Sequence, residues 1–120
     1  MKIYRGYRKM HLSSEAAPTS QTCIVTVEVN RRRRMLRPRL DIRNHSPTGF
    51  EWGYGGSGPA QLALALVADC CGREFAVPSI YQKVKRLVAD LPHDGWILTE
   101  QQVRAAVETA ASAKGKDIET

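Results

Sequence analysis

The chain has 120 residues, of which 42% are hydrophobic and 25% are charged, and its formal net charge is +6. This length and composition fit one domain that can bury a core without disulfides or metal. They exclude a membrane-spanning protein, because no run of about 18 apolar residues occurs. The first residues also lack the apolar stretch of a signal peptide. We therefore expect a cytoplasmic protein that does not enter a membrane.

Positive charge is concentrated in the first third of the chain. Residues 1–43 carry 11 Lys and Arg against 3 Asp and Glu, whereas the remainder carries 7 against 9. Most of the excess comes from six arginines: Arg31, Arg32, Arg33, Arg34, Arg37 and Arg39. A block of this kind is typical of a surface for phosphate-rich or acidic partners.

The first half of the chain predicts strands. Residues 3–7 predict a first strand, and the polar residues 11–21 predict a connection. Residues 23–29 alternate apolar and polar side chains, as a half-buried strand does. A second alternating run, residues 36–42, is also predicted as a strand, and Pro38 indicates an edge strand or the start of a strand. Because the four consecutive arginines lie between these two runs, the simplest arrangement is a β-hairpin with a basic tip.

A glycine-rich loop with large aromatic residues leads into an apolar helix. The aromatic side chains of residues 50–54 alternate as strand residues would, which predicts a short third strand. Ser57 or Gly58 can cap a helix over residues 60–71, and Gly72 is a natural C-terminal stop. This helix is apolar on nearly every side, so it must be buried.

Two further helices follow. Residues 78–91 carry an apolar stripe, and prolines stand at both ends. Residues 96–98 then anchor the chain to the core, and Thr99 with Gln102 resembles a capping box at the start of a third helix. The expected fold class is α+β, with a small antiparallel sheet of two to four strands packed on the central apolar helix and two further helices. We expect residues 1–113 to form this single domain and residues 114–120 to be a flexible C-terminal tail.

Neither the cysteines nor the histidines are arranged as in a metal site. Cys70 and Cys71 are adjacent, Cys23 lies far away in a predicted strand, and the three histidines have no paired spacing. An odd number of cysteines without a Cys-x-x-Cys motif also argues against a disulfide framework. We expect neither a metal nor a cofactor.

Residues 43–66, RNHSPTGFEWGYGGSGPAQLALAL, are the most specific segment of the chain. With residues 40–42 before it, this segment resembles the signature of an uncharacterised family of short bacterial, phage and plasmid proteins, a domain of unknown function. The similarity extends through the second helix to residues 96–99 and back to residues 2–6. The resemblance implies a small α+β domain, often carried on mobile elements, with no established activity. The four-arginine tip departs from the shorter turn of that family, so a basic function would belong to this member.

The glycines match a nucleotide-binding pattern only formally. Residues 53–58 fit G-x-G-x-x-G, but a dinucleotide site needs a hydrophobic strand before the glycines and an acidic residue about 20 positions later. A P-loop lacks its Gly-Lys-Ser/Thr, and Pro59 stands where a nucleophile elbow needs glycine. No catalytic residues are therefore assigned. Two interpretations stay open: a purely structural loop, or an anion site formed by Gly53, Gly55, Gly56, Ser57 and Gly58.

Three hypotheses for function remain. The first is a non-enzymatic binding protein of a mobile element, whose arginines engage nucleic acid or a host nucleoprotein complex; an inhibitor of host defence in the manner of anti-CRISPR proteins would fit. The second is a self-associating module that forms a homodimer. The third is a phosphate- or nucleotide-binding protein or enzyme that uses loop 53–58. For the first, the basic patch could extend to Lys2, Tyr4, Arg5, Tyr7, Arg8 and Lys9.

Overall fold

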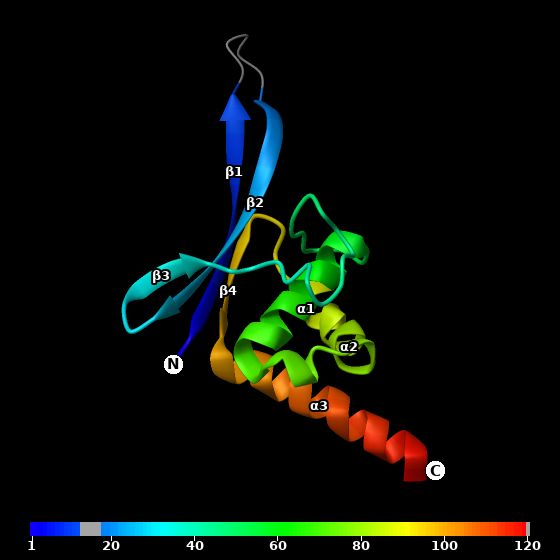
Figure 1. Cartoon of the computed structure of the whole chain (residues 1–120). Helices are drawn as coiled ribbons and strands as arrows, with labels where there is room; N and C mark the ends of the chain where they lie inside the picture. Colours follow the sequence, from blue (N-terminus) through cyan, green and yellow to red (C-terminus); the bar gives the residue numbers. More distant parts are fainter. Residues whose placement is uncertain (13–17, 120) are drawn as a thin grey trace.

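A four-stranded antiparallel sheet carries three α-helices on one of its faces (Figure 1). The computed structural model describes residues 1–12 and 18–119. The strands are β1 (Ile3–Leu12), β2 (Pro18–Val29), β3 (Arg32–Met35) and β4 (Gly95–Thr99). The helices are α1 (Ser57–Cys71), the 3₁₀ turn η1 (Arg73–Phe75), α2 (Pro78–Ala89) and α3 (Glu100–Glu119). The predicted α+β class is confirmed.

The strand order is β3-β2-β1-β4, so β3 and β4 form the two edges. The paired strands β1 and β2 project beyond the helices as a long ribbon (Figure 1). The prediction of a connection over residues 11–21 was therefore wrong for residues 11–12 and 18–21, which are strand; residues 13–17 lie outside the described residues. Backbone pairing continues there because an antiparallel ladder satisfies the N–H and C=O groups without needing apolar side chains.

A two-residue turn joins β2 to β3. Asn30 and Arg31 have φ angles of 52° and 67°, and positive φ at both positions defines the type I′ turn that matches the twist of paired strands. The predicted hairpin is confirmed only in part: β2 does pair with the next strand, but that strand is β3, so Arg32, Arg33 and Arg34 belong to the strand and not to the tip. The strand predicted over residues 36–42 was wrong. After Leu36, whose N–H donates to Val25 O (2.9 Å), the chain leaves the sheet before Pro38, which has no N–H for the ladder.

Helix α1 is the central apolar helix that was predicted. It lies between the sheet and α2, with α3 running below it from the end of β4 (Figure 1), and its residues from Gly58 to Ala68 are all buried. The predicted cap was wrong: the helix begins at Ser57, after Gly56, and no side chain caps it. Its predicted end is correct, because the Gly72 N–H donates to Ala68 O (3.0 Å).

The segment before α1 is not the predicted third strand. Residues 50–54 adopt irregular backbone, because Gly53 has a φ angle of 86° and turns the chain. Phe50 and Trp52 are nevertheless buried in the core, whereas Tyr54 is exposed. The aromatic pattern therefore indicated burial correctly for Phe50 and Trp52 but not for Tyr54, and it was wrong about the secondary structure.

β4 and α3 meet at a capping box. The Thr99 N–H donates to Gln102 Oε1 (2.9 Å), and the Gln102 N–H donates to Thr99 Oγ1 (3.1 Å), which confirms the predicted motif. Residues 114–119, predicted as a flexible tail, continue α3; their flexibility stays a prediction. Within the described residues, no helix has both the length and the apolar character needed to cross a membrane.

Candidate functional site

The six predicted arginines lie on β3, its turn and the segment that follows, and we call them the arginine surface. Three of the six are held in ion pairs: Arg33–Glu28 (3.0 Å), Arg34–Asp69 (2.6 Å) and Arg39–Asp41 (3.0 Å). Arg31, Arg32 and Arg37 are exposed and have no ion-pair partner in the part of the chain that the structure describes. The surface therefore combines arginines fixed in position with arginines left free for a partner.

Asp69 on α1 fixes one end of this surface. Its carboxylate accepts hydrogen bonds from Arg34 (2.6 Å), Tyr4 Oη (2.9 Å) and Lys2 Nζ (3.3 Å). Burial opposes ionisation, but the hydrogen bonds from Arg34 and Tyr4 and the charge of Lys2 prevail and lower the pKa of Asp69. Burial, reinforced by the Asp69 charge, raises the pKa of the Tyr4 phenol. One carboxylate thus ties β1 and β3 to the central helix.

A small cleft opens beside Asp69. It has a volume of about 270 Å³, and it is lined by Arg34, Leu36, Arg37, Arg39, Ala68 and Asp69. Three guanidinium groups therefore share the cleft with one carboxylate that is already bonded to Arg34 and Lys2. Guanidinium forks bind phosphate oxygens in pairs, so the lining suits a phosphate group.

Only part of the predicted extension of this patch reaches the surface. Tyr4 is fully buried, and the Arg8 side chain is only 9% exposed. Arg8 pairs with Glu51 through two hydrogen bonds of 3.0 and 3.2 Å, and its guanidinium lies 4.7 Å from the centre of the Trp52 ring. Tyr4 and Arg8 therefore stabilise the fold, whereas Tyr7 and Lys9 are exposed on the ribbon.

Two glycines of the predicted anion loop have structural roles. The Gly53 N–H donates to Val88 O (3.1 Å), which fastens the loop to α2. A Cβ atom on Gly58 would lie 2.7 Å from the Glu51 Cβ atom, so only glycine allows this approach. At Gly55 a Cβ atom would meet nothing within 4 Å, and the structure gives no packing reason for glycine there.

The start of α1 opens onto a pocket of about 390 Å³. Its polar lining residues are Thr22, Ser46, Thr48, Glu51, Tyr54 and Ser57. Burial favours the neutral acid, but hydrogen bonds from Arg8 outweigh it and lower the pKa of Glu51, so a carboxylate faces the pocket. An anion at Ser57 or Gly58 would meet this negative charge, which weakens the case for a phosphate loop. Anion binding by Gly53, Gly55, Gly56, Ser57 and Gly58 stays an untested prediction.

Gln61 is a structural residue that sequence reasoning missed. Its side chain is fully buried in α1; Oε1 accepts from the backbone N–H groups of His45 (2.7 Å) and Ser46 (3.1 Å), and Nε2 donates to Pro38 O (2.5 Å) and Arg43 O (3.1 Å). All four hydrogen-bonding positions of the amide are used. The sequence did contain a signal for this role, because Gln61 is a polar residue in an otherwise apolar run. This amide fixes the segment that carries Arg37 and Arg39.

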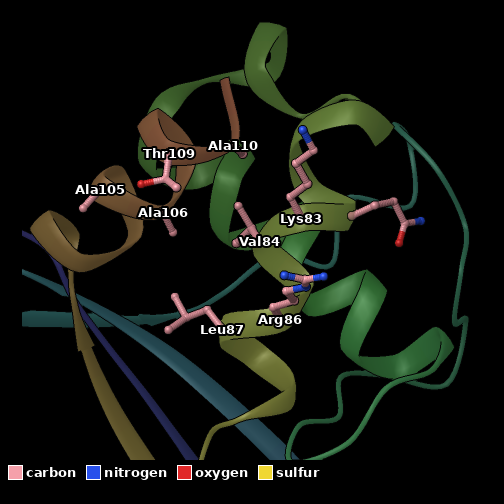
Figure 2. Close-up of a pocket in the computed structure, with 9 residues that line it drawn as sticks. Lys83, Val84, Arg86, Leu87, Ala105, Ala106, Thr109 and Ala110 are labelled. Atoms are coloured by element: carbon pink, nitrogen blue, oxygen red, sulfur yellow. The ribbon is translucent and has the colours of Figure 1, made fainter. Parts of the chain in front are cut away.

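A groove of about 640 Å³ lies between α2 and α3. Figure 2 shows Val84 and Leu87 of α2 facing Ala106 and Thr109 of α3 across it. Lys83, Arg86, Gln82, Ala105 and Ala110 complete the lining. This lining contains no acidic, cysteine or histidine side chain, so it presents no constellation for acid–base or nucleophilic chemistry.

The chain belongs to a family of unknown function, DUF6166, whose model matches residues 4–109. The match runs from β1 into α3 and includes the arginine surface, the glycine loop and all of the groove lining except Ala110. No curated protein and no solved structure matches the chain.

Proposed function

We propose that this chain is a non-enzymatic protein that binds nucleic acid through the arginine surface. The observation that carries the proposal is the group of three exposed arginines, Arg31, Arg32 and Arg37, which have no ion-pair partner among the described residues. Arg37 also lines the cleft, together with Arg34 and Arg39. The β2–β3 turn that bears Arg31 lies away from the helices (Figure 1), so a long polymer has access to it. Arginine contacts to phosphates supply most sequence-independent affinity for nucleic acids.

The ion pairs of the arginine surface support this proposal. Arg33 and Arg34 already have carboxylate partners, so their side chains lose less conformational freedom when a partner binds. The free arginines supply the charge that displaces counterions. The sequence carries no helix-turn-helix, zinc-finger or RNP-like motif, so we expect phosphate-driven binding with little sequence preference.

The setting of this activity is also part of the proposal. A small cytoplasmic protein of a phage, plasmid or other mobile element would use such a surface against host nucleic acid. A host nucleoprotein complex would present the same phosphates, and an inhibitor of host defence, similar in action to anti-CRISPR proteins, would bind there.

The direct test is fluorescence anisotropy with labelled double- and single-stranded DNA over a range of salt concentrations. Replacing Arg31, Arg32 and Arg37 by Ala breaks no ion pair, so the thermal midpoint should stay unchanged. We expect affinity to fall and the slope of log K against log[salt] to decrease by about 2 to 3, close to one unit for each lost phosphate contact. The matched control replaces Lys83, Lys85 and Arg86 on α2, which removes the same charge from another surface.

Two outcomes would overturn the proposal. One is the absence of binding by the unaltered chain at low salt. The other is an equal loss in the α2 control, because affinity would then follow net charge and not the arginine surface. Capture from a host lysate, with and without nuclease, distinguishes free nucleic acid from a host nucleoprotein complex. If a defined complex survives nuclease treatment and its capture depends on Arg31, Arg32 and Arg37, the target is a nucleoprotein complex and not free nucleic acid.

A further inference from the structure

The outer edge of β4 presents unpaired backbone groups. The Glu100 N–H donates to Lys2 O (2.9 Å), and Lys2 lies opposite Glu100 in the register that pairs Tyr4 with Leu98. Because hydrogen-bonded pairs alternate along an antiparallel ladder, Leu98 and Trp96 bond to β1, and the N–H and C=O groups of Ile97 point outward. No residue in the described ranges 1–12 and 18–119 donates to or accepts from these Ile97 groups.

Nothing in the composition of β4 protects this edge. The strand reads Gly-Trp-Ile-Leu-Thr, without charge or proline, and Ile97 at its centre is 63% exposed. Edges normally carry charges, prolines or bulges that prevent pairing with another chain. β3 follows that rule with its arginines, whereas β4 does not.

We propose that β4 pairs with β4 of a second copy of this chain, in antiparallel orientation about a twofold axis through Ile97. The two four-stranded sheets would then form one continuous sheet. The axis places Gly95 opposite Thr99 of the partner subunit, and the outward groups of the two Ile97 residues bond to each other. The exposed Ile97 side chains become neighbours on the open face of the sheet.

The β4 edge is complementary to itself, which is why we propose a second copy of this chain as its partner. A twofold interface requires one patch to fit itself, and an uncharged strand centred on one isoleucine meets that condition. Pairing β3 with β3 would oppose arginines, and pairing β3 with β4 would leave open edges that continue into a filament. Just beyond the strand, Asp94 would face Glu100 of the partner subunit; Arg104, 3.7 Å from Glu100, offsets that repulsion.

Sedimentation velocity of nuclease-treated protein over a wide concentration range tests the proposal, because nuclease removes dimers bridged by nucleic acid. We expect a concentration-dependent dimer that Ile97→Lys converts to monomer. Met35→Lys is the matched control: Met35 is 59% exposed and lies on the same sheet face at the opposite edge. Circular dichroism establishes that both variants fold.

Cross-linking gives a second, positive readout. Paired Cα atoms across the axis would lie about 5.5 Å apart, a separation that suits a disulfide. Ile97→Cys should therefore form a covalent dimer under mild oxidation, and Met35→Cys should not. A monomer at every concentration, or a dimer that survives Ile97→Lys, would overturn the proposal, and either result leaves the nucleic-acid experiment unaffected.

Discussion

The two edges of the sheet differ in how they meet solvent. β3 is fully exposed and contains three arginines, whereas β4 contains no charge and exposes one isoleucine. Both edges present outward backbone groups that another strand could pair with. Charge on β3 discourages such pairing and attracts polyanions, and its absence on β4 permits pairing. One sheet thus separates two kinds of surface by placing them at its opposite edges, with β2 and β1 between them.

The edges are also attached to the core by different forces. Arg34 of β3 bonds to Asp69 of α1, so an ion pair anchors that edge. β4 is anchored by apolar packing: Trp96 covers Gly6 of β1 and meets Trp52 edge-to-face at 5.5 Å between ring centres. The anchors should therefore respond differently to substitution and to pH.

The largest effect is expected where β4 packs on β1. A Cβ atom at Gly6 would lie 2.3 Å from a carbon of the Trp96 ring, so Gly6→Ala must displace the indole. We expect a loss of about 3 kcal/mol in the free energy of unfolding, measured by urea denaturation. Gly55→Ala is the control, because its added Cβ atom would meet nothing within 4 Å. Equal stability of the two variants would contradict this account of the β4 anchor.

Removing Asp69, which anchors β3, should lower the free energy of unfolding somewhat less. Asp69→Ala leaves the buried Tyr4 hydroxyl and the Arg34 guanidinium without their acceptor, whereas Lys2 Nζ keeps its hydrogen bond to the backbone oxygen at position 69 (2.7 Å). Because the Asp69 side chain is 14% exposed, water can hydrate part of the groups left without a partner. We therefore expect the free energy of unfolding, measured by urea denaturation, to fall by about 2 kcal/mol. Asp41→Ala, which removes an exposed acid that also pairs with arginine, should leave stability unchanged. A similar loss in both variants would show that the position of Asp69 does not matter.

Acid should remove part of the stabilisation that Asp69 provides. The pKa of Asp69 is lower in the folded chain than in the unfolded chain, where it is about 3.9. Its contribution is therefore complete above that value and declines as the pH falls through the folded pKa. Urea denaturation of the wild type and of Asp69→Asn should show a stability difference at neutral pH that narrows below about pH 4. A difference that does not change with pH would contradict an ionised Asp69.

The sequence predicted the parts of the fold that depend on local patterns. Residues 60–71 showed a buried helix, and Thr99 with Gln102 showed how α3 begins, because both signals lie within a few positions. β4 was missed as a strand, since five residues give too few alternations. The extension of β1 to Leu12 was missed because its pairing with β2 is set by the partner strand and not by its own polar residues.

The candidate site was predictable in composition but not in arrangement. The arginine run indicated a basic surface, but the division into free and paired arginines depends on Asp69, which is 35 positions from Arg34 along the chain. Periodicity could not reveal that Asp69 points from the central helix toward β3. The same holds for Arg8, whose charge suggested a surface role although Glu51 and Trp52 hold it in the interior.

The smallest effect is expected at the end of β4, where the capping box closes the open edge. Thr99→Ala removes the Oγ1 acceptor of the Gln102 N–H, which should cost about 1 kcal/mol in urea denaturation. Thr109→Ala replaces an exposed residue within α3; it is the control and should leave the free energy of unfolding almost unchanged.

Gln102→Ala changes the edge of β4 itself. The outward Thr99 N–H then loses its acceptor, so β4 has one more free donor for pairing with another strand. If β4 forms the proposed dimer, this variant should associate at least as strongly as the wild type, although α3 is less stable; weaker association would count against pairing through this edge.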